Sequence, residues 1–173
     1  MALLGSILKR TIELRESMPK IRKVSGYDQQ VNVLKKLLTK AEFTAFGEHY
    51  GFSKILNETD IIDAFQKQVH THDYNSMFKK WWFRALNGEA FVCWPRRVKY
   101  FALSSGTSEA SSKYIPVTSD MLRAIKKTSI RQLVSQGRYN FPKEHFERGA
   151  LMLGGSTHLN YNGTYFVGDL SGI

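Results

Sequence analysis

Hydrophobic residues in the first half of the chain recur every three or four positions, the spacing of an amphipathic helix. The clearest example lies between Tyr27 and Phe46. Ser25 and Asp28 stand at its start with the separation of a capping box, in which side chains satisfy backbone amides of the first turn. The pattern predicts a helix with one apolar face, formed by Val31, Leu34, Leu37, Leu38 and Ala41.

Two further helices are predicted before residue 90 by the same spacing. The shorter one should begin near Thr59 or Asp60 and continue through the segment IIDAFQKQV. The other should span Ser76 to about Asn87. It should stop before Gly88, because glycine readily takes the left-handed conformation that ends a helix.

The pattern changes after residue 97, where short apolar runs alternate with turns and one long helix. The segments VKYFALSS, KYIPVT, ALMLGG and TYFVGDL have the length and the β-branched or aromatic content of strands. An amphipathic helix is predicted from Ser119 to about Gln136. This order of elements predicts an α/β fold, in which a helical N-terminal region is followed by a β-sheet.

Composition narrows the class of protein. With 173 residues, 42% of them hydrophobic, the chain is long enough for one domain with a core. The single cysteine, Cys93, lies in the apolar segment AFVCWP and is interpreted as a buried hydrophobic residue rather than a nucleophile. One cysteine excludes a disulfide scaffold, and no apolar run approaches the roughly 20 residues of a membrane span. The N-terminal MALLGSIL lacks the features of a secretion signal, so a cytoplasmic location is predicted.

The formal net charge is +10, and the basic residues are concentrated outside residues 41–75, which are acidic on balance. Such a charge suits a partner that carries phosphates, whether a nucleotide, a nucleic acid or an anionic lipid. Charge alone does not choose among these partners, because basic residues on solvated helix faces give the same net value.

The segment YFALSSGTSEASSKYIPVT, residues 100–118, places a hydroxyl-rich turn between two predicted strands. The nucleotide P-loop pattern G-x-x-x-x-G-K-[ST] and the Rossmann pattern G-x-G-x-x-G are both absent from it. The turn SSGTS nevertheless offers backbone amides and hydroxyl groups, and Lys113 adds an ammonium at the start of the next strand. These groups can form an anion-binding nest, so the loop is predicted to bind a polyphosphate.

This segment resembles the first nucleotide-binding motif of the auxin-responsive Gretchen Hagen 3 acyl-acid amido synthetases, a branch of the adenylate-forming superfamily. The family pattern is close to S-S-G-T-[ST]-x-G-x-x-K-x-[IM]-P. The chain matches it at Ser104, Ser105, Gly106, Thr107, Ser108, Lys113, Ile115 and Pro116. Upstream, LKKLLTKAEFTAFGEHYGF resembles the family's helix and F-G-x-x-Y-G-F turn. DYNSMFKKWWFRALNGEAFVCWPRRVKYF, LMLGGST and GTYFVGDLSGI also resemble family sequence, of the bacterial type more than that of the plant hormone enzymes.

The chain departs from the family in two ways. Ala110 stands where the family usually has a second glycine, which adds a Cβ beside the expected path of the phosphates. The family's later adenine, ribose and Y-R-x-G-D-type motifs and its mobile C-terminal domain are not found. Residues 1–173 are therefore expected to form the N-terminal part of a single large adenylate-forming domain, with part of its mixed β-sheet, as a fragment of a longer enzyme.

The resemblance implies a two-step reaction that uses ATP and Mg²⁺. A carboxylic acid is adenylated with release of pyrophosphate, and the acyl group then passes to an amine or amino acid. Lys113 is implied to be both a catalytic and a nucleotide-binding cation, and Arg131 is a candidate partner for the substrate carboxylate, with a solvated arginine as the alternative. The β- and γ-phosphates would be held by the cofactor-binding residues Ser104, Ser105, Gly106, Thr107 and Ser108.

Other candidate chemistry is sparse. His70 and His72 have an H-x-H spacing, which would place both imidazoles on one face of a strand, and Asp73 is adjacent. These residue types could bind a metal, and the favoured alternative is a loop or surface role. No further ligand cluster is evident, and no metal site is assigned. Asp169 in GDLSGI is interpreted either as a turn residue or as a residue near the nucleotide.

Two alternative functions differ in class from the synthetase hypothesis. A nucleic-acid-binding module would use the net charge and the aromatic residues of FKKWWFR, although helical spacing favours core or interface positions for Trp81 and Trp82. This alternative leaves the ordered loop unexplained. The other alternative is a non-catalytic remnant of the family. The favoured hypothesis has small-molecule carboxylic acid and amine substrates, no nucleic-acid partner and no membrane partner, and it leaves the oligomeric state open.

Overall fold

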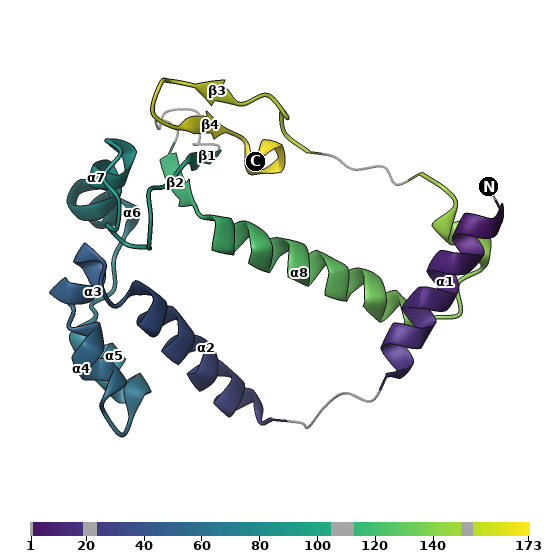
Figure 1. Cartoon of the computed structure of the whole chain (residues 1–173), viewed down its shortest axis with the longest axis horizontal. Coiled ribbons are helices and arrows are strands. Elements are labelled where there is room, and N and C mark those ends of the chain that lie inside the picture. The colour runs from purple at the N-terminus through teal and green to yellow at the C-terminus, as the bar shows by residue number, and fades with distance from the viewer. Residues whose placement is uncertain (1, 19–23, 105–112, 150–153) are drawn as a thin grey trace. The chain divides into compact units, whose positions relative to one another are not determined.

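The computed structural model describes residues 2–18, 24–104, 113–149 and 154–173 (Figure 1). The chain folds into two compact units, each made of two separate stretches of sequence. The first, here called the helical unit, contains Met1–Lys23 and Ser119–Gly154. The second, here called the sheet unit, contains Val24–Thr118 and Gly155–Ile173. The predicted phosphate loop belongs to the sheet unit.

The sheet unit begins with a series of helices. They are α2 (Gly26–Ala41), α3 (Ala45–His49), α4 (Phe52–Leu56), α5 (Ile61–Gln68), α6 (Tyr74–Met77), the π-helical turn η1 (Phe78–Trp82) and α7 (Phe83–Leu86) (Figure 1). Ser25 caps α2 through its side chain, as predicted. Asp60 caps α5, which agrees with the predicted start near Thr59 or Asp60. The helix predicted between Tyr27 and Phe46 ends at Ala41, because Thr44 caps the separate helix α3.

The helix predicted to start at Ser76 begins earlier, at Tyr74. The cause is Asp73, whose carboxylate accepts a hydrogen bond from the Ser76 amide at 2.7 Å and so satisfies the first turn. The π-helical turn η1 interrupts the predicted α-helix in its middle. Gly88 follows the last turn with a φ of 88°, which agrees with the predicted stop.

In the part of the chain that the structure describes, four strands form one mixed sheet in the order β2-β1-β4-β3. They are β1 (Tyr100–Ser104), β2 (Lys113–Val117), β3 (Asn160–Tyr161) and β4 (Phe166–Gly168), and the 3-10 turn η4 (Leu170–Gly172) follows. β1 is antiparallel to β2 and parallel to β4, and β3 is antiparallel to β4. The predicted α/β fold with a mixed sheet is confirmed. Of the strand predicted over ALMLGG, residues 150–153 lie outside the described residues, and Gly154 and Gly155 are not in a strand.

The core of the sheet unit joins its helices to the central strand β1. Phe101 in β1 is fully buried, and Leu38 of α2 and Trp81 of η1 belong to the same cluster. Burial of such side chains is the main favourable term in folding. The end of β1 that carries Ser104 is therefore tied to the core through Phe101.

The F-G-x-x-Y-G-F segment, residues 46–52, forms part of this core. The ring of Phe46 lies 5.2 Å from that of Trp81, centroid to centroid, in an edge-to-face arrangement. A Cβ on Gly47 would lie 2.1 Å from the carbonyl oxygen of Ala41, so a larger residue requires the backbone to move. The motif is therefore explained by packing.

The helical unit contains α1 (Ala2–Ser17), α8 (Ser119–Ser135) and the 3-10 turns η2 (Gln136–Arg138) and η3 (Lys143–Phe146). α8 agrees with the helix predicted from residue 119 to about 136. α1 was not predicted as a separate element, and it packs against α8, η2 and η3. Ile12 of α1 is buried, and Arg138 Nε donates a hydrogen bond to Glu16 at 2.7 Å. Among the residues that the structure describes, no helix is both long and apolar enough to cross a membrane.

Candidate functional site

The predicted phosphate loop leaves the sheet at Ser104 and returns to it at Lys113. These residues are Cα partners in the antiparallel register of β1 and β2, at the end of the ladder where the loop begins. Ser104 is half-buried, and Lys113 is exposed. The other residues predicted to bind the nucleotide are Ser105, Gly106, Thr107 and Ser108. They and Ala110 lie outside the described residues. The described part of the candidate site is therefore the base of the loop.

Lys113 presents its ammonium to an aromatic ring. Its Nζ atom lies 5.2 Å from the centroid of the Tyr74 ring, within the range of a cation–π interaction. Within the described ranges of the chain, no carboxylate forms an ion pair with Lys113. The side chain of Lys113 is exposed at the base of the loop.

Tyr74, the first residue of α6, contacts the hairpin in a second place. Its hydroxyl accepts a hydrogen bond from the Tyr114 amide at 3.0 Å. Its ring stacks on Phe78 at a centroid distance of 5.6 Å and meets the edge of Trp82 at 5.8 Å. Tyr74 lies before the helix that the apolar spacing predicts from Ser76, so this spacing does not indicate it. The aspartate at position 73 was the available signal, since aspartate is favoured as an N-cap.

The residues described at the base of the loop can be compared with the predicted ligands, a polyphosphate and Mg²⁺. An exposed ammonium beside a hydroxyl-rich loop suits a polyphosphate, because hydrogen bonds to a charged acceptor are roughly twice as strong as neutral ones. Within the part of the chain that the structure describes, no group of three or more His, Cys, Asp or Glu residues could hold a metal ion. Mg²⁺ commonly binds substrate phosphates together with one or two carboxylates, so the predicted ATP and Mg²⁺ do not require such a group, and both stay predictions.

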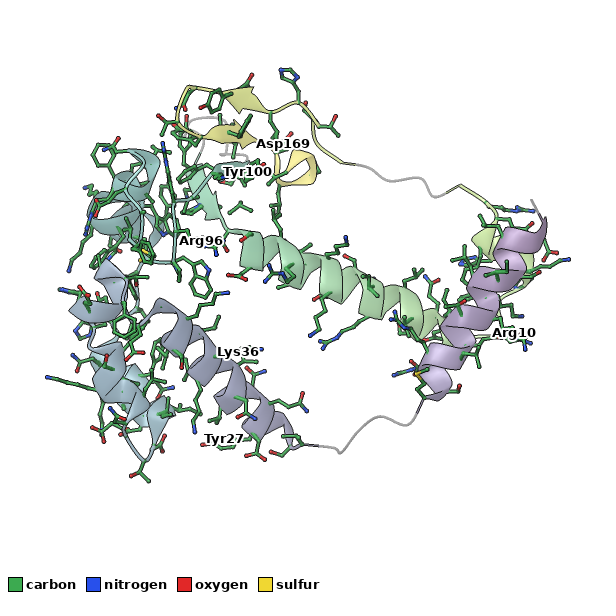
Figure 2. The ribbon with its side chains drawn as sticks, in the orientation of Figure 1. Arg10, Tyr27, Lys36, Arg96, Tyr100 and Asp169 are labelled. Atoms are coloured by element: carbon green, nitrogen blue, oxygen red, sulfur yellow. The ribbon has the colours of Figure 1, made fainter. Side chains whose placement is uncertain are left out.

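Asp169 directly follows β4, and Ser104 is the last residue of β1. Because β1 and β4 are parallel, both residues lie at the carboxyl ends of these strands. Gly168 is the register partner of Ala102 in the parallel pair, so Asp169 lies beside the end of β1 (Figure 2). The Asp169 carboxylate accepts a hydrogen bond from the Ser156 amide at 2.7 Å. The carboxylate thus joins the end of β4 to the segment at Ser156 and makes no capping bond to η4, and a role near the nucleotide stays a prediction.

Arg131 lies on α8, in the helical unit. Its side chain is exposed, and no residue of α8 is buried. An exposed guanidinium fits the solvated alternative. The predicted contact between Arg131 and a substrate carboxylate remains a prediction.

The H-x-H segment takes part in the packing of the sheet unit. His72 Nε2 lies 2.9 Å from the hydroxyl oxygen of Tyr50, which is a hydrogen-bonding distance. The Asp73 carboxylate caps α6, and hydrogen bonds from Ser76 lower its pKa. These contacts give His72 and Asp73 structural roles.

Cys93 is half-buried, and burial raises the pKa of its thiol from 9.0 to about 12. The reactive form of cysteine is the thiolate, which such a pKa makes very rare at neutral pH. Cys93 lines an apolar pocket with residues such as Leu38, Phe65 and Trp94. These observations agree with the prediction that Cys93 is a hydrophobic residue and not a nucleophile.

The aromatic segment FKKWWFR directs its tryptophans into the protein. Trp81 is only 3% exposed, and Trp82 packs against the core cluster. The Lys80 ammonium and the Arg84 guanidinium lie 5.2 Å and 5.7 Å from the centroid of the Trp81 ring. The predicted core position of the tryptophan pair is confirmed. Trp81 is too buried for base stacking, whereas Trp82 is half-buried.

Most of the chain matches the sequence model of a protein family. Residues 22–170 match the family model described as the GH3 family N-terminal domain. The matched range contains both ends of the loop, Ser104 and Lys113, and it also contains Tyr74. No curated protein and no solved structure matches the chain.

Proposed function

The chain belongs to the GH3 family, and on this premise we propose that it forms the N-terminal, ATP-binding part of a cytoplasmic acyl-acid amido synthetase of bacterial type. In this reaction, a carboxylate oxygen attacks the α-phosphorus of ATP, the bond to the β-phosphate breaks, and pyrophosphate leaves. The nitrogen of an amine or amino acid then attacks the acyl carbon, loses a proton and displaces AMP. The product is an amide.

The pairing of Ser104 with Lys113 is the observation that carries this proposal. Because the two residues are register partners, the loop starts and ends at one point of the sheet, and the Lys113 ammonium stands where it ends. A fixed cation beside the loop would hold the β- and γ-phosphates and stabilise the charge that develops on departing pyrophosphate. The SSGTS turn would supply amides and hydroxyl groups to the same phosphates.

The remaining partners follow from the same proposal. Mg²⁺ bound to ATP would supply further charge neutralisation at the phosphates. Arg131 would pair with the carboxylate of the acyl acid, for which its exposed guanidinium is chemically suited. The substrates would be a small carboxylic acid and an amine or amino acid, with no nucleic acid and no membrane involved.

Chemical protection of lysines tests the proposed phosphate site. The chain is acetylated at low reagent concentration with and without ATP or pyrophosphate, and each lysine is quantified by mass spectrometry. Lys113 is expected to be protected by either ligand. Lys99, an exposed lysine one residue before β1, is the matched control and is expected to react equally in all samples. Equal acetylation of Lys113 with and without the ligands would contradict the proposal.

The same measurement separates the two alternative functions. Protection of basic residues by DNA that disappears as salt is added, without any response to ATP, would favour a nucleic-acid-binding module. A lack of response to ATP, pyrophosphate and DNA would favour a non-catalytic remnant.

A further inference from the structure

We propose that Tyr74 is a positioning residue of the phosphate site, which fixes both Lys113 and the start of β2 before a nucleotide binds. This inference rests on the function proposed above for the loop. Tyr74 would not touch the phosphates itself and would act through Lys113. Two separate contacts and a rigid aromatic support carry the inference.

The first contact lies between Tyr74 and the backbone of β2. β2 is at the edge of the sheet, so amides on its outer side have no strand partner. The Tyr74 hydroxyl accepts a hydrogen bond from the Tyr114 amide at 3.0 Å. Tyr114 directly follows Lys113, so this bond fixes the backbone next to the residue at which the loop ends.

The second contact lies between the Tyr74 ring and the Lys113 side chain. The ammonium is 5.2 Å from the ring centroid, while the lysine as a whole is exposed. The ring therefore restricts the position of the charge without removing it from solvent. A cation that is already ordered loses less conformational freedom when a polyphosphate binds, which favours binding.

The Tyr74 ring is itself held in place by the π-helical turn η1. Phe78, four residues later, stacks on the Tyr74 ring with 24° between the two planes. Trp82 meets the same ring at 5.8 Å and also packs against the core of the sheet unit. π-helical turns within α-helices are frequent at functional sites. Here the turn supplies two aromatic contacts that connect Tyr74 to the core.

Nuclear magnetic resonance of methylated lysines tests the ring contact directly. Reductive methylation with ¹³C-formaldehyde keeps the positive charge, and Lys113→Arg identifies the Lys113 resonance. The ring current of Tyr74 is expected to shift this resonance upfield in the wild type and in Tyr74→Phe, and the shift is expected to vanish in Tyr74→Leu. A Lys113 resonance at the ordinary lysine position in the wild type would overturn the inference, whether or not the Tyr74 variants fold.

Calorimetric titration with ATP measures the effect on binding. Tyr74→Leu is expected to weaken ATP binding about two- to tenfold, as estimated from the free-energy cost of ordering one long side chain on binding. Tyr74→Phe keeps the ring and is expected to lose less affinity than Tyr74→Leu. Lys80→Ala removes a lysine at the same 5.2 Å distance from a different ring, that of Trp81, and is expected to bind ATP as the wild type does.

The outcomes for the inference and for the proposed function are distinct. Wild-type affinity in Tyr74→Leu, together with weakened binding in Lys113→Ala, would overturn the role of Tyr74 and leave the phosphate site intact. Wild-type affinity in Lys113→Ala would overturn the phosphate site itself. In that event the upfield resonance would still report the contact between Tyr74 and Lys113.

Discussion

Ser104 and Lys113 face each other across the β1–β2 ladder at the point where the loop begins and ends. The pairing links two features that are distinct in the sequence, a hydroxyl-rich turn and a lysine five residues beyond it. β1 is anchored through the fully buried Phe101, and β2 is connected to Tyr74 through the Tyr114 amide. The strands that carry Ser104 and Lys113 are thus both held by contacts within the sheet unit.

Replacement of Gly47 tests the packing of the F-G-x-x-Y-G-F segment. In Gly47→Ala the new Cβ would lie 2.1 Å from the Ala41 carbonyl oxygen, so the backbone must shift. We expect the free energy of unfolding to fall by about 1–3 kcal/mol, the usual range for overpacking. Urea denaturation followed by circular dichroism measures the change.

Gly26→Ala is the matched control for Gly47→Ala. Gly26 is the first residue of α2, and no atom lies within 4 Å of the Cβ that alanine would add. We expect an unchanged stability or a gain of up to about 1 kcal/mol, because alanine restricts the unfolded chain. Equal stability of the two alanine variants would contradict the packing explanation of Gly47.

Thr44 provides a test of a buried hydrogen-bonding group. Its hydroxyl donates to the Ala41 carbonyl oxygen at 2.7 Å and accepts from the Gly47 amide at 3.1 Å, and the residue is 1% exposed. Thr44→Val keeps the shape but removes the acceptor of the Gly47 amide, while the Ala41 carbonyl oxygen keeps its bond from the Thr44 amide. Because the Gly47 amide is left unpaired in a buried position, we expect a loss of about 1–3 kcal/mol in unfolding free energy. Thr44→Ser keeps the hydroxyl and should lose less. A valine variant as stable as the serine variant would refute the role of these bonds.

Cys93 gives a prediction about pH. Burial raises the pKa of its thiol to about 12 in the folded chain, whereas the unfolded thiol ionises near 9.0. As pH rises above about 9, the unfolded state loses this proton first, so the contribution of Cys93 to stability falls between pH 9 and pH 12. Iodoacetamide labelling of the folded chain should therefore keep accelerating beyond pH 9, while labelling in urea levels off near that value. A plateau near pH 9 in the folded chain would disprove the raised pKa.

The sequence predicts those features that depend on neighbouring residues. The cap at Ser25, the helix start near Asp60, the strands on either side of the SSGTS turn, and the helix that starts at Ser119 are all confirmed. Each depends on spacing or turn chemistry within a few residues. The core positions of Trp81 and Trp82 could also be predicted, since both fit the helical period of their segment.

The remaining features depend on contacts between distant parts of the chain. Tyr100 pairs with Phe166 in the parallel part of the sheet, and such long-range pairing leaves no local signal in the sequence. The π-helical turn η1 could not be distinguished from an α-helix by its apolar spacing, because it occupies a single turn. The contact between Tyr74 and Lys113 joins residues far apart in the sequence. It depends on the three-dimensional arrangement of α6 and the β1–β2 hairpin within the sheet unit, which no local pattern indicates.

Calorimetric measurement of ATP affinity in Lys113→Ala is the most direct test of the proposed phosphate site. Lys99→Ala is the control, because it removes an exposed lysine that immediately precedes β1 and lowers the net charge equally. We expect Lys113→Ala to weaken ATP binding about tenfold or more, as loss of a hydrogen bond to a charged group commonly costs about 1.5–3 kcal/mol. We expect Lys99→Ala to bind like the wild type. Equal ATP affinity of Lys113→Ala and the wild type would contradict the assignment of residues 104–113 as a phosphate-binding loop.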